Sequence, residues 1–396
     1  MKHFPPQRNV GCIFPIEQGF TEKWKGDVIT SSANDSIKVL RGSTPTFFGG
    51  ALRPGYFTPA NAVKDNKFYF AAVTDLDELS RVEGEKKPTF RSVLLPGTLT
   101  RLEREKGVVS YQIEFGSKEQ ERELLTKHNE AGRGAEFSEL TVFQDRLYTF
   151  DDRTGDVFEI LNRDDGASSY VVPRFVITEG DGETDKGMKW EWATVKNGEL
   201  VMGSMGKAYT NSKGEIMNTN NLYVSILNAR GELRREDWAA RYDVVREALN
   251  AMDPGYLIIE AVLWSDYHRK WVFLPRRISQ EAYNDVKDEY KGSNKLVMVD
   301  ENFRKATVVD IQMESMDPLK GFSTFAFVPG TKDRHAIAIR SVEEGCADGD
   351  DCKQRSYCLV FDVKTGEVLS PEVQFAEPMK FEGIEFVNLN TKPPSL

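Results

Sequence analysis

The stretch SELTVFQDRLYTFDDR, from Ser138 to Arg153, carries the pattern that decides the fold. It opens on a polar residue, continues as an apolar strand, makes a tight turn, and runs back as a second apolar strand to a charged tip. Two apolar runs of strand length joined by a short polar turn are typical of a β-hairpin. How often the same layout recurs in the chain therefore distinguishes among a sandwich, a barrel and a propeller.

The layout recurs four more times. The other segments are EWATVKNGELVMGSMGK from Glu191, EAVLWSDYHRKWVFLPRR from Glu260, STFAFVPGTKDRHAIAIR from Ser323, and the shorter EGIEFV from Glu382. Their starts are about 60 residues apart, which leaves room for two more strands after each hairpin, as in a four-stranded propeller blade. The sequence therefore predicts an all-β fold, a five-bladed β-propeller.

The fifth segment stops after its first strand, and the N-terminal part of the chain supplies the missing partner. KFYFAAVTDLD, from Lys67 to Asp77, reads as a second blade strand with no first strand before it. Pairing the C-terminal strand with this one closes the ring and leaves no open sheet edge. We expect an N-terminal arm outside the repeat over 1–55, one propeller domain over 56–390, and a C-terminal tail over 391–396.

Helical periodicity is scarce. Glu236 to Met252 is amphipathic, with one apolar stripe, and Ser279 is placed to cap a second short helix that runs to Glu289. The stripe consists of Trp238, Tyr242, Val245 and Leu249. Two helices in an otherwise β-rich sequence fit insertions between blades.

Composition excludes several partners and locations. The 52 Lys and Arg against 62 Asp and Glu give a net charge of −10, which disfavours nucleic acid as a partner. Charges interrupt every apolar run well before the ~20 residues that a transmembrane helix needs. The N-terminus MKHFPPQRNVG has no apolar signal-peptide core, so we expect the chain to be intracellular or already trimmed. The glycosylation sequon Asn34-Asp-Ser36 favours the secretory pathway.

Three of the four cysteines fall in CADGDDCKQRSYC. Cys346 and Cys352 bracket a polar turn, where a disulfide and two free thiols are both compatible with the pattern. Cys358 lies in an apolar strand and reads as a buried thiol. Zinc is disfavoured because no histidine is close in sequence.

The polar residue that opens each repeat belongs to the innermost strand of its blade and should face the central channel. These five residues are Ser138, Glu191, Glu260, Ser323 and Glu382. Three carboxylates and two further oxygens, with water, reach the 6 to 8 oxygen ligands of Ca²⁺, whereas zinc and copper favour His or Cys. The alternative is that these side chains solvate a wet channel, although three buried carboxylates without a cation would repel one another.

A second alignment uses the tips that follow the second strands, which meet at one mouth of the channel. The tips contain Asp75 and Asp77, Asp151-Asp152-Arg153, Gly206-Lys207, Arg276-Arg277 and Arg340. Basic groups beside a metal suit phosphate, and carboxylates there suit activation of water. Surface salt bridges between solvated tips are the alternative. The chain has no G-x-x-x-x-G-K-[ST], H-E-x-x-H or G-x-S-x-G motif, so side chains and metal would have to hold the phosphate.

Six ordered motifs between about Lys67 and Val387 carry a family resemblance. They are RGAEFSELTVFQDRLYTFDDRTG, GDGETDKGMKWEWATVK, PGYLIIEAVLWSD, WVFLPRRISQEAY, GFSTFAFVP and FEGIEFV. The sequence resembles the soluble calcium-activated nucleotidases, which include the bed-bug-type apyrases. This resemblance implies a five-bladed propeller with one channel calcium, hydrolysis of nucleoside di- and triphosphates to monophosphate and orthophosphate, and residence in the endoplasmic reticulum or Golgi lumen or secretion.

The resemblance also implies roles for individual residues. Carried over by motif, the metal ligands fall on the same five channel residues, with Glu139 in an outer position where vertebrate members have Asp. Water-handling acids match Asp75 and Asp152, phosphate-side bases match Lys207, Arg276, Arg277 and Arg340, and Tyr209 stands where vertebrate members have a base-stacking Trp. UDP, GDP, ADP and their triphosphates remain equally open as substrates, and the residues favour no oligomeric state.

Two other functions remain open from the residues. A non-catalytic, calcium-stabilised propeller could bind a protein or glycan, but it would need only the calcium ligands and not the ring of acid and base beside them. A calcium-dependent lactonase would want a histidine base near the metal, and no blade tip supplies one.

Overall fold

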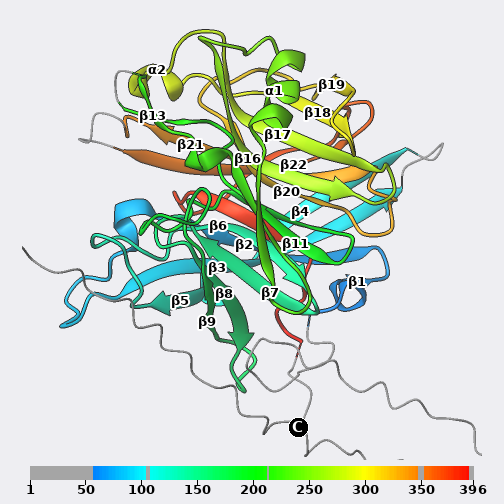
Figure 1. Cartoon of the computed structure of the whole chain (residues 1–396). Helices are drawn as coiled ribbons and strands as arrows, with labels where there is room; N and C mark the ends of the chain where they lie inside the picture. Colours follow the sequence, from blue (N-terminus) through cyan, green and yellow to red (C-terminus); the bar gives the residue numbers. More distant parts are fainter. Residues whose placement is uncertain (1–56, 104–107, 212–213, 347–351, 392–396) are drawn as a thin grey trace, which may run out of the picture. The chain divides into compact units, whose positions relative to one another are not determined.

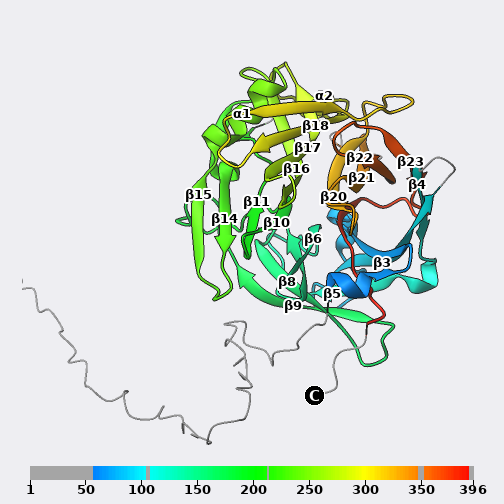
Figure 2. The same ribbon diagram turned by 90° about the vertical axis from the view of Figure 1, so that its right-hand side faces the viewer.

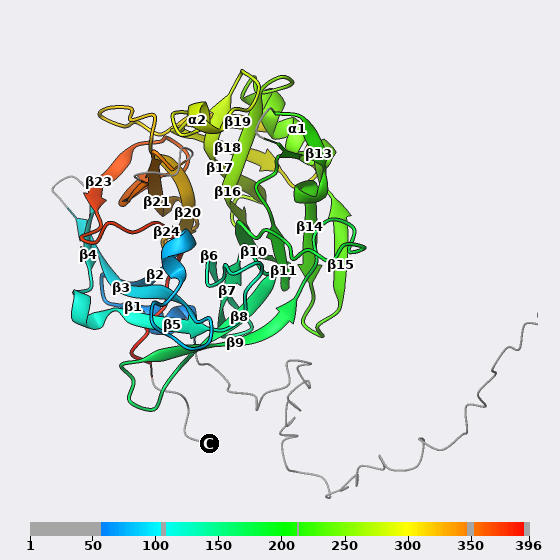
Figure 3. The same ribbon diagram turned by 90° about the vertical axis from the view of Figure 1, so that its left-hand side faces the viewer.

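Five four-stranded antiparallel units radiate from a common axis, and Figures 2 and 3 show the ring they form. The computed structural model describes residues 57–103, 108–211, 214–346 and 352–391, which belong to one compact unit. The predicted five-bladed β-propeller is confirmed. The predicted arm over 1–55, its sequon and the last five residues of the tail lie outside the described residues.

Each blade is named by its strands from the axis outward. Blade 1 is β24 (Phe381–Glu385), β2 (Lys67–Thr74), β3 (Phe90–Glu103) and β4 (Val109–Phe115); blade 2 is β6 (Phe137–Phe143), β7 (Arg146–Asp151), β8 (Asp156–Asn162) and β9 (Ser169–Val176); blade 3 is β10 (Trp192–Lys196), β11 (Glu199–Gly203), β14 (Tyr223–Leu227) and β15 (Leu233–Asp237); blade 4 is β16 (Tyr256–Ser265), β17 (Lys270–Ser279), β18 (Lys295–Asp300) and β19 (Ala306–Asp310); blade 5 is β20 (Gly321–Phe327), β21 (His335–Glu344), β22 (Lys353–Asp362) and β23 (Val368–Gln374).

A few short elements accompany the blades. Blade 1 also carries β1 (Val63–Lys64) beside β2 and β5 (Arg122–Thr126) beside β3, and β12 (Tyr209–Thr210) pairs with β13 (Ile216–Asn218) in a separate hairpin. The helices within the described residues are α1 (Ala239–Ala248), α2 (Asp285–Asp288) and 3-10 turns at Pro59–Ala62, Asp77–Ser80, Lys118–Gln120 and Asn220–Leu222. Figure 1 shows both α-helices on blades 3 and 4.

The ring closes as the sequence predicted. The C-terminal β24 pairs with β2 in the register Ala71↔Glu385, Ala72↔Ile384 and Val73↔Gly383. The five inner strands β6, β10, β16, β20 and β24 contact one another in a closed circle. The N- and C-terminal parts of the propeller therefore share blade 1, and its inner strand comes from the end of the chain.

Gly383 lets two inner strands approach closely at this seam. A Cβ at Gly383 would lie 2.6 Å from the backbone carbon of Glu139 and 2.8 Å from Cγ1 of Val73. Contacts this short are not tolerated by backbone, so only glycine fits between β24 and β6. The close approach brings Glu382, the preceding residue, beside the backbone of Glu139.

Apolar side chains fill the space between neighbouring blades. Between blades 1 and 5, for example, Phe70, Ile339 and Phe381 are each at most 1% exposed and belong to one cluster. Alternation along each strand sends successive side chains to the two faces of a blade, and both faces are covered by the neighbouring blades. The blades are therefore held by ordinary burial, and polar residues are left for the axis and the loops.

The two predicted helices are shorter than expected. All four stripe residues of the first are buried, but Glu236 belongs to β15, so α1 begins only at Ala239. The second prediction is wrong: Ser279 ends β17, and its hydroxyl oxygen accepts a bond from the backbone nitrogen of Glu281 in a local turn. The side chain of Asn284 caps α2 instead, through the backbone nitrogen of Lys287.

Cys346 and Cys352 form a disulfide, which settles the alternative that the sequence left open. Cys358 is a buried free thiol, as predicted. Among the described residues, no helix has the length and apolar character needed to cross a membrane.

Candidate active site

A cavity of about 230 Å³ lies at one mouth of the channel. Its wall is almost entirely charged, with eight carboxylates and six cationic side chains. The lining residues are Asp75, Asp77, Arg133, Asp152, Arg153, Lys189, Glu191, Met205, Ile258, Glu260, Arg276, Arg277, Asp288, Glu343, Lys380 and Glu382. No histidine or cysteine is among them, so the donors available to a metal here are oxygens.

The repeat-opening residues lie where the propeller interpretation put them. Glu260, Ser323 and Glu382 are on inner strands, as is Ser138, and Glu191 directly precedes β10. All five are buried, and the three glutamates line the cavity. The Ser323 hydroxyl bonds that of Ser341.

Two further groups beside the channel bear on a metal site. The Oγ of Ser138 is buried and has no hydrogen-bond partner among the described residues. Glu139 is also buried, and its Oε1 accepts bonds from the Leu140 backbone nitrogen at 2.8 Å and the Thr324 hydroxyl at 3.0 Å. Within the described part of the chain the Ser138 hydroxyl lacks a partner, and a cation in the channel would supply one. The carboxylate of Glu139, the next residue, has one oxygen already bonded by protein groups.

The three channel glutamates all have raised pKa values. Burial, with the neighbouring carboxylates of Glu260 and Asp152, raises the pKa of Glu191 to about 8 despite the opposing charge of Lys189. Burial likewise raises the pKa of Glu260, and it raises that of Glu382 well above its usual range. These raised pKa values mean that burial first, and the neighbouring carboxylates second, disfavour the ionised forms, which a cationic partner would stabilise. An all-oxygen site with excess negative charge suits a hard divalent cation such as Ca²⁺.

Cationic side chains of the protein itself already contact these carboxylates. Lys189 Nζ lies 2.9 Å from Glu191 Oε1 and also contacts Asp152. Arg276 Nη1 donates to both Glu260 and Glu382, the latter at 2.8 Å. The cavity is therefore a network in which acids and bases alternate.

Lys380, like Arg276, contacts several carboxylates of that network at once. Its side chain is 5% exposed, and its ammonium lies 2.7 Å from Asp75, 2.8 Å from Asp77, 3.1 Å from Glu343 and 3.6 Å from Glu382. These four carboxylates outweigh burial and raise the pKa of Lys380 well above its usual range, so the ammonium stays charged.

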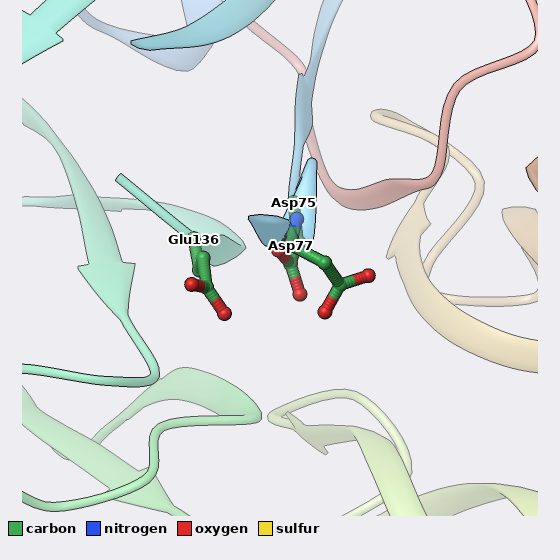
Figure 4. A group of neighbouring side chains, drawn as sticks. All are labelled: Asp75, Asp77 and Glu136. Carbon is green, nitrogen blue, oxygen red and sulfur yellow. Dashed lines mark hydrogen bonds between the residues drawn. The ribbon is translucent and has the colours of Figure 1, made fainter. Parts of the chain in front are cut away.

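Asp75, Asp77 and Glu136 form an acidic cluster on one side of the mouth, and Figure 4 shows their carboxylates turned toward the same space. One oxygen of each lies within 4.8 Å of the others, so the group could also hold a cation. Arg133 balances part of this charge, at 2.6 Å from Glu136 and 3.1 Å from Asp77. Burial and the charges of Asp75 and Asp152 raise the pKa of Glu136 to about 9.

The two acids predicted to handle water differ in how their oxygens are engaged. Both oxygens of Asp75 are bonded, Oδ1 to the Asp77 backbone nitrogen at 2.8 Å and Oδ2 to Lys380. Asp152 bonds Lys189 through Oδ2, whereas its Oδ1 is buried with no hydrogen-bond partner among the described residues. Asp151, its neighbour, is structural, because its carboxylate accepts bonds from the backbone nitrogens of Ala135 and Arg153.

Arg276 and Arg277 line the cavity, as expected for phosphate-side bases. Arg277 Nη1 donates to the Leu319 carbonyl at 3.0 Å, and its nearest ion-pair contact is Asp288 at 3.8 Å. Burial first, and then the like charge of Arg276, lower the pKa of Arg277. An incoming anion would relieve both effects, which makes this guanidinium a suitable phosphate ligand.

Lys207 and Tyr209 are not among the residues that line the cavity. The Lys207 ammonium donates to the Thr210 hydroxyl at 2.7 Å and sits 4.1 Å above the ring of Tyr283. Burial lowers the pKa of Lys207 to about 8. Tyr209 is 47% exposed on the β12–β13 hairpin, so its ring is accessible.

The expected position of Arg340 at the mouth is wrong. Its side chain is fully buried between blade strands, where it pairs with Glu372 at 2.7 Å and donates to the Lys320 carbonyl at 3.0 Å. The sequence pattern predicted Arg340 at the end of its strand, but β21 continues for four more residues to Glu344, so Arg340 lies in the middle of the strand. The tip of this blade brings Glu343 to the cavity instead.

Sequence reasoning missed several cavity residues, although a signal for them was present. Side chains two residues apart on a strand point to the same face. The residues two positions before the five channel residues are Glu136, Lys189, Ile258, Gly321 and Lys380. Lys189, Ile258 and Lys380 line the cavity, and Glu136 belongs to the acidic cluster. Glu343 and Asp288 carry no such repeat signal.

Comparisons with known proteins identify the family of this sequence. A family model described as Apyrase matches residues 76–387. The apyrase of Cimex lectularius is 37% identical over 330 residues, covering 83% of this chain and 85% of that protein. Soluble calcium-activated nucleotidase 1 of Rattus norvegicus is 37% identical over 337 residues, covering 85% and 77%. The apyrase of Phlebotomus duboscqi is 34% identical over 317 residues, covering 80% and 88%.

Proposed function

This chain belongs to the Apyrase family, and from that premise we propose a calcium-dependent hydrolysis of nucleoside di- and triphosphates to monophosphate and orthophosphate at the channel mouth. The predicted resemblance is confirmed, and the chain is a nucleotide-hydrolysing enzyme. Family membership favours this function over the non-catalytic propeller and the lactonase. The observation that carries the proposal is the charged cavity itself, with channel carboxylates, an acid with one free oxygen, and arginines in one space.

We assign the calcium site to the channel. Glu191, Glu260 and Glu382 supply carboxylate oxygens, Ser138 and Ser323 supply further oxygens, and Glu139 holds an outer position. The orphaned Ser138 hydroxyl and the raised pKa values of the three glutamates support this assignment. A calcium ion held by these residues would supply charge neutralisation and a fixed orientation for a phosphoryl group.

The chain's own residues would then divide the work. Asp152 accepts the proton of the attacking water through its free Oδ1, and Lys189 orients the carboxylate through Oδ2. Asp75, with both oxygens engaged, holds Lys380 at the acid side of the mouth. Arg277 and Arg276 hold the phosphate oxygens, since a guanidinium can fork onto two of them.

The nucleoside would extend outward over the β12–β13 hairpin. The accessible Tyr209 ring offers a face for stacking the base, and Lys207 adds positive charge between the ring and the cavity. Arg340 has no part in substrate binding in this proposal, because it is buried behind the blade. Stacking is tolerant of the base, so UDP, GDP, ADP and their triphosphates all fit the site's chemistry.

The disulfide supports a place in an oxidising compartment. Bridges such as Cys346–Cys352 persist in secreted proteins and in the lumen of the secretory pathway, and are rare in the reducing cytosol. We propose that the protein works in the endoplasmic reticulum or Golgi lumen or after secretion.

A nucleotide panel tests the function. With calcium present, we expect orthophosphate from nucleoside tri- and diphosphates and none from monophosphates, because the reaction cleaves a phosphoanhydride. Phosphate is quantified over time for the uridine, guanosine and adenosine series, with a chelator control for each. Release from monophosphates, or no release from any diphosphate, would contradict the proposal.

A further inference from the structure

The guanidinium of Arg276 bonds two channel carboxylates through one nitrogen and a third carboxylate through the other. Nη1 donates to Glu260 and Glu382, which are two of the carboxylates assigned to calcium, and Nη2 donates to Glu343 at 2.6 Å. The side chain is 5% exposed, so these three carboxylates are its main charge partners. Arg276 and a calcium ion therefore draw on the charge of the same two glutamates.

Glu343 is the only one of the three carboxylates that lies off the inner strands. It is near the end of β21, where Oε2 accepts from Arg276 and Oε1 accepts from Lys380 at 3.1 Å. Although burial opposes ionisation, Lys380 and Arg276 hold the pKa of Glu343 well below its usual range. Glu343 is thus held in its ionised form by two cations, and it lines the same cavity as Glu260 and Glu382.

The position of Glu343 is fixed by the loop that follows it. The backbone nitrogens of Gly345 and Cys346 donate to the Glu289 carboxylate at 3.0 and 2.8 Å. The Cys346–Cys352 disulfide closes the same end of the β21–β22 pair. This end of β21 is therefore anchored both to the segment after α2 and across its own turn.

Blade 5 also leaves room for Arg276. Gly321 occupies the position that carries Glu136, Lys189 and Lys380 in other blades. A Cβ there would lie 2.4 Å from Cγ of Arg276 and 2.6 Å from its carbonyl oxygen. Only glycine therefore lets the arginine extend between Glu343 and the channel glutamates.

We infer that Glu343 is a positioning residue that sets the calcium affinity of the channel by sharing the charge of Arg276 with Glu260 and Glu382. The inference rests on the calcium site proposed above. A cation paired to a metal ligand opposes metal binding, because it repels the ion and neutralises the ligand. Glu343 weakens that opposition by sharing the guanidinium.

A double-mutant cycle separates this role from simple charge. Arg276→Gln should tighten calcium binding about tenfold, and Glu343→Gln should weaken it about tenfold. If Glu343 acts through Arg276, adding Glu343→Gln to Arg276→Gln should change the dissociation constant less than about twofold. If Glu343 acts on calcium directly as a charge, the two effects should add.

The measurement is calcium titration calorimetry on the full chain without nucleotide, with thermal melts to confirm folding. Glu344→Gln is the matched control, since it removes the same charge one residue away, where Glu344 pairs with Arg355 at 2.8 Å. It should leave the calcium dissociation constant unchanged.

If Arg276→Gln does not fold, Arg276→Met replaces it, because methionine keeps part of the length of the side chain and removes its charge. Glu343→Gln should then shift the dissociation constant less than about threefold. Additive effects, or weaker calcium binding in the arginine variant, would overturn the inference. A parent protein that binds no calcium would instead refute the proposed metal site.

Discussion

Asp152→Asn should lower kcat for nucleoside diphosphate hydrolysis about a thousandfold, within the range for loss of a general base. The amide keeps the size of the side chain but cannot accept a proton at the position of Oδ1. That oxygen is buried and without a partner among the described residues, whereas Oδ2 contacts Lys189. Steady-state phosphate release gives kcat, and calorimetry gives the calcium dissociation constant of the same protein.

Calcium binding should be nearly unchanged in this variant, because Asp152 is assigned to water and not to the metal. Asp165→Asn serves as the control: its carboxylate bonds only to Ala167 and Ser168 of its own exposed turn, so its kcat should match the parent. If Asp152→Asn loses calcium affinity in proportion to kcat, Asp152 is a metal ligand and its assigned role is wrong.

Truncation after Pro378 should prevent the domain from folding. It removes β24, and with it the buried side chains of Phe381, Ile384 and Phe386, each at most 5% exposed. Their burial contributes about 2 kcal/mol each, so about 6 kcal/mol is lost against a typical stability of about 5–15 kcal/mol. The edge of β2 would also lose its partner strand. The truncation removes Lys380 as well, so Asp75 and Asp77 would lose the ammonium that pairs with both.

Glu382→Gln separates the strand from the ligand that it carries. The substitution keeps β24 and its packing, so the variant should melt within a few degrees of the parent in chelator. Added calcium should raise the melting temperature of the parent more than that of the variant, because the stabilisation by a bound ligand grows with the logarithm of its affinity. Circular dichroism melts of both variants provide the comparison. A truncated chain that melts like the parent would show that β24 does not close the ring.

The sequence was sufficient to predict the ring because a propeller repeats one local pattern. Each hairpin begins with a polar residue, and the first strand of a propeller blade is innermost, so the repeat places Ser138, Glu191, Glu260, Ser323 and Glu382 at the axis. The orphan strand at Lys67 then required a partner, and only the chain's end could supply it. The first inference uses the repeated hairpin, and the second uses the need to pair a free strand edge. Both can be read from the sequence without the structure.

The ends of strands and the starts of helices were harder to predict. Arg340 looked like a tip residue, but the length of β21 puts its guanidinium inside the blade and sends Glu343 to the mouth. Ser279 looked like a helix cap, but its hydroxyl closes a local turn and Asn284 caps α2. The length of β21 depends on its pairing with β22, which a pattern within β21 does not contain. The turn at Ser279 and the cap at Asn284 are both short-range contacts, and the pattern favoured the wrong one of two residues suited to capping.

We propose that the channel mouth hydrolyses nucleotides only with calcium in the channel. The most direct measurement is phosphate release from a nucleoside diphosphate by chelator-treated protein, supplied with calcium or magnesium at matched free concentrations. We predict turnover with calcium and little with magnesium, because a flexible cage of glutamate and serine oxygens suits calcium at about 2.3–2.6 Å and not a tight octahedron at about 2.0–2.1 Å. Equal release with magnesium alone, or undiminished release in chelator, would contradict the account.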